Sequence, residues 1–368
     1  IMGNVPNLRF PEFSGEWKKC IIQDYGEVIT GNTPPTSNTE YYNNGSFLWA
    51  SPADLGIGKK INDTKTKLSL LGFKKTRVIP QGSILVTCIG STIGKMGMAA
   101  ETMSSNQQIN SIVVHEKNNN DFVYYAISRA FPRYLSEVGV QAVPILSKSN
   151  FEKLPNYTTS RNEQDKIGCF LNLIDERIAT QNKIIGKLQS LIKGLAVTLT
   201  TKGKPNTAIS QCLECHSSTL QESEGSTNGL YKVFGANGLV GYTDVPQMNG
   251  DAVLVIKDGS GVGTTSYVQG KFAVIGTLNY LTVIGNNDLR YLYFALSVFN
   301  FQPYKTGMAI PHIYFKDYGK AKIYCPPLTE QKRVANVLGK LESKLLLHKK
   351  LITLFNQQKQ YLLGQMFI

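Results

Sequence analysis

The segment "CLECH", from Cys212 to His216, is the stretch whose side chains most resemble a cofactor site. Two thiols and an imidazole in this order match the attachment pattern of c-type haem, in which both sulfurs bond the porphyrin and the histidine ligates iron. Cys212, Cys215 and His216 are also candidate zinc ligands, although structural zinc takes a fourth ligand from another close-spaced group. The remaining cysteines are scattered singly: Cys20, Cys88, Cys169 and Cys325. A cofactor-bearing redox or zinc protein is therefore one hypothesis, against a loop with ordinary thiols.

The glycine turn "GSTIGK", from Gly90 to Lys95, resembles a phosphate-binding loop. A P-loop has four residues between its glycines and a serine or threonine after its lysine. Here three residues separate the glycines, and Met96 follows the lysine. The spacing therefore favours a turn that joins two strands, with Ser91, Thr92 and Lys95 exposed. Such hydroxyls and a lysine can still approach a phosphate backbone.

Other patterns for chemistry on DNA are missing from the sequence. Amino-methyltransferases place an acidic or amide residue before Pro-Pro and an aromatic after it, and neither "CPPL" nor "TPPT" has these flanks. No glycine-rich cofactor loop follows a strand, no cluster of carboxylates for a metal is visible, and the four histidines form no evident triad. We therefore predict a non-catalytic chain that holds no cofactor and no metal of its own.

The composition favours a soluble protein with a polyanionic partner. With 39 basic and 26 acidic residues among 368, the chain carries a net charge of +13, which suits nucleic acid. No apolar run approaches the roughly 20 residues that span a bilayer, and the opening "IMGNVPNLRFPEF" has no apolar signal core. Six cysteines are too few for a disulfide scaffold and fit a reducing compartment. We expect a cytoplasmic protein of two or three domains with no membrane contact.

The sequence contains the same unit twice. The segment "PNYTTSRNEQDKIGCFLNLIDERI" returns as "PPLTEQKRVANVLGKLESKLLL" when Glu163-Gln164 is aligned with Glu330-Gln331. The same alignment matches "VPILSKSNF" with "IPHIYFKDY", so that Pro144 falls on Pro311, and further upstream "ILVTCIGSTIGK" resembles "AVLVIKDGSGVGT". Repetition on this scale indicates the architecture before any single motif does. We predict two copies, each a globular part followed by a helix.

Each globular part is predicted to mix strands and helices. Short β-type runs such as "FLWAS", "SILVTCI" and "NSIVVH" are separated by loops rich in Gly, Asn, Pro and Thr. An amphipathic helix, "DFVYYAISRAF" from Asp121, follows them, and "DLRYLYFALSVF" from Asp288 is its counterpart in the second copy.

Each copy ends in a long helix with a heptad seam. Ser160-x-x-Glu163 has the spacing of a capping box, and apolar residues then alternate at spacings of four and three, interrupted at Gln181 in the first copy and at His348 and Lys359 in the second. The seam residues are Ile167, Leu171, Ile174, Ile178, Ile185, Leu188, Ile192, Leu195, Val334, Leu338, Leu341, Leu345, Ile352, Phe355 and Leu362. Because an isolated stripe would leave large apolar side chains in water, the helices are expected to form a coiled coil that holds the domains apart. A purely structural coiled-coil protein is the alternative, and the duplication of the attached domains argues against it.

These residues together resemble the DNA-specificity subunits of type I restriction-modification systems. The resemblance rests on the duplicated "EQ" helix starts, the turns "GSTIGK" and "GSGVGT", the opening "VPNLRFPEFSGEW" and the segment "GNTPPTSNTEYYNNGSFLWASPADL". It implies two target-recognition domains, each reading half of a bipartite double-stranded DNA site, separated by two antiparallel helices. The second domain departs from the pattern, because "TKGKPNTAISQCLECHSSTLQESEG" lacks the tryptophan that leads the first.

The resemblance also implies protein partners. Two modification subunits would bind S-adenosylmethionine and methylate adenine, and motor-nuclease subunits, where present, would use ATP with Mg. The implied role of this chain is non-catalytic: it recognises the DNA sequence and positions these subunits on it.

The expected fold class is α+β, with two mixed α/β recognition domains separated by two long helices that form an intramolecular antiparallel coiled coil. The internal repeat is expected to have pseudo-twofold symmetry. We place the first recognition domain at residues 1–155, its helix at 156–200, the second domain at 201–325 and its helix at 326–368.

Candidate DNA contacts are basic residues for phosphates and amide or hydroxyl side chains for base edges. In the first domain they are Lys59, Lys60, Lys74, Lys75, Arg77, Ser91, Thr92, Lys95, Asn106, Gln107 and Gln108. In the second domain they are Asn237, Lys257, Ser260, Thr264, Lys271, Asn279 and Tyr280. The glutamine and asparagine amides are expected to pair with adenine.

Overall fold

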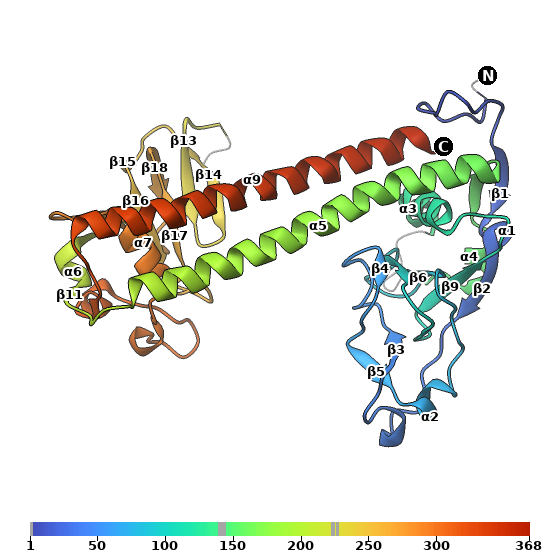
Figure 1. Ribbon diagram of the computed structural model, residues 1–368, viewed down its shortest axis with the longest axis horizontal. Helices are drawn as coiled ribbons and strands as arrows, with labels where there is room; N and C mark the ends of the chain where they lie inside the picture. Colours follow the sequence, from blue (N-terminus) through green and yellow to red (C-terminus); the bar gives the residue numbers. More distant parts are fainter. Residues whose placement is uncertain (1–2, 139–144, 222–224, 226–227) are drawn as a thin grey trace. The chain divides into compact units, whose positions relative to one another are not determined.

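The computed structural model describes residues 3–138, 145–221, 225 and 228–368 and divides into two compact units (Figure 1). Unit 1 contains Ile1–Asn182 together with Leu351–Ile368, and unit 2 contains Lys183–Lys350. Each unit has its own sheets and its own hydrophobic core, which confirms the predicted mixture of α and β structure. Val143 and Pro144 of the predicted repeat lie outside the described residues, as do residues 222–224 in the opening of the second predicted domain.

The strands of unit 1 are, in chain order, β1 (Lys18–Ile21), β2 (Gly26–Thr30), β3 (Phe47–Ala50), β4 (Lys60–Ile61), β5 (Thr66–Leu68), β6 (Ile84–Thr87), β7 (Met96–Ala99), β8 (Ser104–Ser105), β9 (Ile109–Val114) and β10 (Pro155–Thr158). A five-stranded sheet has the order β2-β9-β6-β7-β4, a three-stranded sheet has the order β5-β3-β8, and β1 pairs with β10. The central strand β6 is buried on both faces, which explains its continuous apolar sequence.

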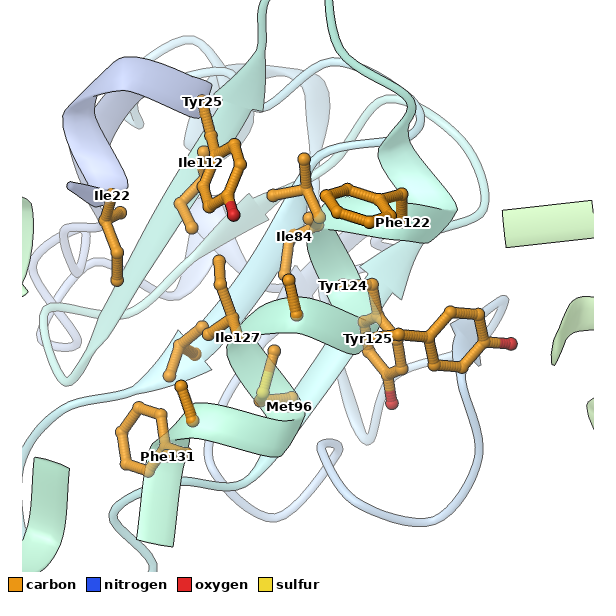
Figure 2. Packing of buried hydrophobic residues seen from close by; sticks show 14 of the residues in the cluster. Ile22, Tyr25, Ile84, Met96, Ile112, Phe122, Tyr124, Tyr125, Ile127 and Phe131 are labelled. Atoms are coloured by element: carbon orange, nitrogen blue, oxygen red, sulfur yellow. The ribbon is translucent and has the colours of Figure 1, made fainter. Parts of the chain in front are cut away.

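Helix α3 (Asn120–Val138) covers one face of the five-stranded sheet. Figure 2 shows Ile84 and Ile112 of this sheet in one apolar cluster with Phe122 and Ile127 of α3. Leu85 belongs to a separate apolar cluster on the opposite face of the sheet, because successive side chains of a strand alternate in direction. The five-stranded sheet therefore packs against α3 on one face and against the three-stranded sheet on the other. This packing holds the turn after β6 on a rigid support.

The strands of unit 2 are β11 (Thr207–Ala208), β12 (Leu213–Ser217), β13 (Tyr231–Gly235), β14 (Gly238–Thr243), β15 (Met248–Asn249), β16 (Ala252–Ile256), β17 (Thr265–Val268), β18 (Lys271–Val274), β19 (Leu278–Val283) and β20 (Lys322–Ile323). They form sheets with the orders β12-β19-β16-β17, β14-β13-β18-β15 and β11-β20. In β16, Val253 faces the core that contains α7 (Leu289–Ser297), and Leu254 faces Phe272 of the second sheet.

The shorter helices of unit 1 are α1 (Ile22–Tyr25), η1 (Thr39–Tyr41), α2 (Leu70–Phe73) and α4 (Lys148–Glu152). Those of unit 2 are α6 (Ile209–Cys212), η3 (Gln302–Tyr304) and α8 (Phe315–Tyr318).

The two long helices α5 (Arg161–Thr200) and α9 (Leu328–Met366) contribute to both units. The backbone N–H of Glu163 points to the Ser160 hydroxyl at 3.4 Å, at the position predicted for the cap. In unit 1 the beginning of α5 shares a core with the last turns of α9, and in unit 2 the end of α5 shares a core with the beginning of α9. The helices are therefore antiparallel within each unit.

Every predicted seam residue is buried or half-buried. Ile167 and Leu171 lie in the core of unit 1 together with Leu362, and Val334 and Leu338 lie in the core of unit 2. The break at Lys359 has a specific partner, because its ammonium forms an ion pair with Asp175 Oδ1 at 2.6 Å. The seam therefore continues past Lys359 to the end of α9.

Candidate nucleic-acid interface

The glycine turn of unit 1 connects β6 to β7, as its spacing predicted. Its closing hydrogen bond runs from the Gly94 N–H to the Thr87 carbonyl at 2.9 Å. Gly90 and Gly94 have φ values of +92° and +89°, which glycine adopts without strain. A Cβ at position 94 would lie 2.7 Å from the Phe131 ring. The turn is therefore pressed against the aromatic ring of α3, and only glycine fits there.

Unit 2 contains the same turn between β16 and β17. The Gly263 N–H donates to the Ile256 carbonyl at 2.9 Å, and Gly263 has a φ of +87°. A Cβ at this position would lie 2.8 Å from the Phe301 side chain. The exposed side chains of this turn include Ser260 and Thr264, two of the predicted contacts. The repeat predicted from sequence thus extends to the hydrogen bonds and aromatic support of the turn.

A second loop lies against each turn. In unit 1 the Leu146 N–H donates to the Cys88 carbonyl at 2.8 Å. In unit 2 the Gly259 N–H donates to the Pro311 carbonyl, and the Ile313 N–H donates to the Lys257 carbonyl, both at 2.9 Å. These bonds attach each turn to the neighbouring loop, so its exposed groups have defined positions.

In unit 1 a chain of hydrogen bonds brings distant predicted contacts together. The Asn32 amide donates to the Lys75 carbonyl and accepts from the Arg77 N–H, both at 2.8 Å. The neighbouring Thr33 hydroxyl donates to the Gln107 side-chain oxygen.

Gln108, which follows Gln107 in the sequence, links these hydrogen-bonded residues to the glycine turn. The Cys88 N–H donates to the Gln108 carbonyl at 2.7 Å, and the Gln108 amide nitrogen lies 3.8 Å from where a Cβ of Gly90 would be. The resulting surface, called the unit 1 polar surface below, consists of Asn32, Thr33, Lys74, Lys75, Arg77, Ser91, Thr92, Gln107 and Gln108.

The basic side chains of the unit 1 polar surface are not neutralised by carboxylates. Lys74, Lys75 and Arg77 are exposed, and among the described residues none of them is within ion-pair distance of an acidic side chain. Exposed uncompensated charge beside amide and hydroxyl groups is the composition of a surface that contacts both phosphates and bases. Lys60 and Lys95 are also exposed, outside this hydrogen-bonded chain.

The structure corrects the expectation for Lys59. Its side chain is 6% exposed, and its ammonium lies 2.6 Å from Asp121 Oδ1 and 3.0 Å from the Tyr125 hydroxyl. Burial lowers the pKa of Lys59, and the contact with Asp121 opposes that shift. Lys59 and Lys60 differ because successive side chains of an extended segment point to opposite sides. Lys59 therefore joins its loop to α3 and is not presented to a phosphate.

Two predicted amides are also structural. Asn106 is buried, and its amide donates to the Gln108 side-chain oxygen at 3.0 Å. Asn279 is buried and accepts from the Ser217 hydroxyl at 3.0 Å. Its neighbour Tyr280 is half-buried. These side chains hold strands and loops together, so they are not available to base edges.

The remaining predicted residues of unit 2 are distributed over different elements. Asn237 and Lys271 are exposed on the sheet that contains β13 and β18, whereas the glycine turn extends from the other large sheet. Lys257 is half-buried at the base of the turn. Unit 2 therefore offers the turn itself, with Ser260 and Thr264, as its best-defined polar feature.

Asn32 and Thr33 were missed as site residues by the sequence interpretation. They follow Gly31, where a Cβ would lie 2.2 Å from the Asn106 carbonyl oxygen and 2.3 Å from that of Ser105. The sequence "GNTPPT" at the end of a strand was the available signal, because a glycine there permits close approach of two backbones.

The structure does not support the cofactor hypothesis for "CLECH". Cys212 ends α6 with its thiol buried and donating to the Ile209 carbonyl at 3.3 Å, and the rest of the segment is strand β12. Cys215 and His216 are neighbours on that strand, so they point to opposite faces. The His216 ring stacks on Tyr280 at 4.8 Å and pairs with the Thr282 hydroxyl at 2.9 Å. Across the residues that the structure describes, no three His, Cys, Asp or Glu side chains are placed to share a metal.

Burial raises the pKa of the Cys215 thiol to about 11, so this sulfur is protonated at neutral pH and is not a thiolate ligand. Cys212 thus ends a helix and residues 213–217 form a strand of the sheet, so the loop predicted as the alternative is also replaced by regular structure.

The family model for the type I restriction modification DNA specificity domain matches residues 14–190 and 214–356. The chain belongs to this family. Each matched region of this specificity-domain protein contains one glycine turn and part of a long helix, which agrees with the repeat seen in the structure.

Named relatives of the specificity-domain protein are specificity subunits. It is 31% identical over 186 residues to the type I restriction enzyme HindI specificity subunit of Haemophilus influenzae, covering 48% of this chain and 40% of that one. It is 29% identical over 177 residues to the EcoR124I/EcoR124II specificity subunit of Escherichia coli, covering 46% of this chain and 43% of that one. These alignments thus span less than half the length of either relative.

Solved structures share the fold of the specificity-domain protein. The S subunit of a type I restriction-modification system from M. genitalium matches with a TM-score of 0.72 and 17% identity, covering 99% of both chains. A chain from a structure of type I R-M complex assembly and conformational transition matches with a TM-score of 0.54 and 14% identity, covering 95% of this chain and 97% of that one. The expected fold class is confirmed by these neighbours. Among the described helices, none has the length and hydropathy of a membrane span.

Proposed function

We propose that this chain recognises a bipartite double-stranded DNA sequence, one half with each unit, and positions adenine methyltransferase subunits on it. The observation that carries the proposal is the duplicated glycine turn, which has the same closing hydrogen bond and the same aromatic support in both units. A rigid turn that occurs twice in one chain suits a target with two halves. The family membership supports the same role.

Phosphate contacts in unit 1 would come from Lys74, Lys75 and Arg77. These side chains are exposed and lack acidic partners among the described residues, so they keep their full attraction for a polyanion. Neutralising phosphates releases counterions, and this term makes binding weaken steeply with salt. The turn hydroxyls of Ser91 and Thr92 would add uncharged contacts to the same backbone.

Base reading in unit 1 would come mainly from Gln107, with the half-buried Gln108, whose side-chain oxygen already accepts from Asn106, beside it. A glutamine amide offers a donor and an acceptor in the spacing that adenine presents in the major groove. The Gln107 side chain is exposed, and the Thr33 hydroxyl orients its oxygen. Orientation of the amide before binding reduces the entropy lost on contact and so favours discrimination between bases.

The partners would be two modification subunits that carry S-adenosylmethionine, and motor-nuclease subunits that use ATP with Mg where such subunits exist. Large apolar side chains outside the seam support protein partners on the long helices. They are 44–59% exposed and include Leu173, Leu191, Val337, Leu347 and Leu354. Large apolar side chains that stay exposed on a helix are typical of protein–protein contacts when they gather in a patch.

The chain itself would be non-catalytic, in keeping with its named relatives, which are specificity subunits. A cytoplasmic location agrees with this role and with six free cysteines. The domain boundaries remain those proposed from the sequence: 1–155, 156–200, 201–325 and 326–368.

The proposal is tested by sequencing the methylome of a host that carries a matching modification subunit, with and without this chain. We expect methylated adenines in a two-part motif only when the chain is present. Replacing residues 17–143 by the same segment of another specificity subunit should change one half of the motif and leave the other. A swap that alters both halves would contradict independent reading, and methyl transfer by the purified chain alone would contradict a non-catalytic role.

A further inference from the structure

The short helix α2 of unit 1 presents two large apolar side chains to solvent. Leu70 and Leu71 are 53% and 56% exposed, although they are adjacent and lie in a compact domain. The helix is found beside β3 and β5 in Figure 1. Two neighbouring exposed leucines leave a contiguous apolar tip in water, and such a feature indicates a contact with another molecule.

The tip is held rigidly by its surroundings. The Ser69 hydroxyl accepts from the Gly72 N–H at 3.2 Å and donates to the Glu40 carbonyl at 2.7 Å. The Phe73 ring stacks on Phe47 with centroids 4.7 Å apart. Because α2 is fixed at both ends, Leu70 and Leu71 do not fold back onto the domain to hide from water.

Basic residues flank the tip in the sequence. Lys74, Lys75 and Arg77 follow α2 directly, and they are exposed without acidic partners among the described residues. Lys67 lies on the preceding strand and is paired with Asp63 at 2.9 Å. One carboxylate, that of Glu40, belongs to η1, and the Glu40 carbonyl accepts a hydrogen bond from the Ser69 hydroxyl. The net charge around the leucines is therefore positive, which matches a polyanionic surface with apolar faces.

The tip is continuous with the unit 1 polar surface. Lys75 and Arg77 are hydrogen-bonded to Asn32, and the adjacent Thr33 is hydrogen-bonded to Gln107. If the bases of a duplex contacted Gln107, the phosphate backbone of the same duplex would lie next to Lys75. Nucleic acid is thus favoured over a lipid surface as the molecule that covers the leucines.

We propose that Leu70 and Leu71 form an apolar wedge that enters a DNA groove beside the bases contacted by Gln107 and unstacks one base step. The inference rests on the proposed DNA recognition and adds a deformation of the target to it. Leucine is among the residues that DNA-bending proteins insert between base steps, where the apolar side chain replaces part of the lost stacking. Lys74 and Lys75 hold the flanking phosphates, so the wedge and its charges act together. The protein would then prefer, at the wedged step, the base sequence that unstacks most easily, although no side chain forms a hydrogen bond to those bases.

The experiment uses the full chain with its modification subunits and a duplex that carries the motif found by methylome sequencing. The duplex contains 2-aminopurine at successive steps of the half-site read by unit 1, outside the adenine that is methylated, because its fluorescence rises when stacking is lost and the methyltransferase itself flips its target base. Dyes at the two ends report bending by energy transfer. The variant is Leu70→Ala/Leu71→Ala. The matched control is Leu8→Ala, since Leu8 is 43% exposed and lies on the N-terminal segment bound to Gln365 of α9.

We expect the unsubstituted chain to raise fluorescence at one step and to bend the duplex. The double variant should lose both signals and bind about tenfold more weakly, with an unchanged melting temperature. Leu8→Ala should behave as the unsubstituted chain. A double variant that keeps the fluorescence rise would overturn the wedge, as would leucine-dependent binding to phosphatidylglycerol vesicles in place of DNA. If the unsubstituted chain bound a scrambled duplex equally well, the proposed recognition itself would fail.

Discussion

The side-chain oxygen of Gln164 accepts a hydrogen bond from the backbone N–H of Asn119 at 2.9 Å. Gln331 makes the same bond to Asp288, also at 2.9 Å. Both glutamines are almost fully buried, and each binds the start of the helix that covers the sheet of its unit. The duplicated "EQ" therefore has a structural meaning: its glutamine joins a long helix to the domain beside it.

Replacing Gln164 or Gln331 by alanine should lower the free energy of unfolding by about 1–3 kcal/mol, because a buried backbone N–H would lose its acceptor. Urea denaturation measures the change. Gln189→Ala, at an exposed position of α5, is the control and should have little effect. Equal midpoints for Gln164→Ala and Gln189→Ala would show that the buried bond is not required.

Gly94→Ala and Gly263→Ala should each destabilise the protein by about 1–3 kcal/mol, since φ is near +90° and the new methyl would meet an aromatic ring. Gly186→Ala is the opposite case, because that helical glycine has open space around it. It should stabilise α5 by about 1 kcal/mol. Thermal melting compares the three variants, and a neutral result at Gly94 would mean that the turn is not held as described.

Lys59 and Lys75 should give opposite results in a salt titration of DNA binding. Lys75→Ala should reduce the slope of log K against log salt by about 0.9 with unchanged stability, because one phosphate contact is lost. Lys59→Ala should lower the melting temperature and leave the slope as it was, because its ammonium is paired with Asp121 inside the domain. A reversed pattern would return Lys59 to the DNA interface.

Glu163 should make the stability of the protein sensitive to acid. Burial acts to raise its pKa, but hydrogen bonds from Arg9 and other donors outweigh burial and hold the pKa below its ordinary value. A carboxylate with a lowered pKa contributes stability above the unfolded-state value, and this contribution is lost as pH falls through the folded-state value.

Stability should therefore drop as pH falls below the ordinary pKa of a glutamate in the unsubstituted chain, and less so in Glu163→Gln. Glu330→Gln is the control, because Glu330 is the equivalent residue and pairs with Lys202 in a more exposed position. Denaturation midpoints of the chain and both variants, measured from neutral to acidic pH, test whether Glu163 causes the acid sensitivity. Parallel acid profiles for the chain and Glu163→Gln would exclude Glu163 as the source.

The sequence by itself determined the duplication, the heptad seam and the position of both glycine turns. These features depend on local geometry: helix period sets the seam, and a turn needs glycine at particular steps. Ile167 and Leu338 could be assigned to a buried face because residues spaced by three and four share one side of a helix whatever surrounds it.

Only the tertiary structure decided which polar residues are exposed. Lys59 was expected at the surface with Lys60, yet its partner Asp121 lies on a helix remote in sequence. Asn32 became a site residue because it bonds to Lys75 and Arg77 across a loop. Composition and spacing indicate that such groups are present, but a buried charge or amide must find its partner wherever the chain brings one within hydrogen-bond distance, and that is a property of the folded domain.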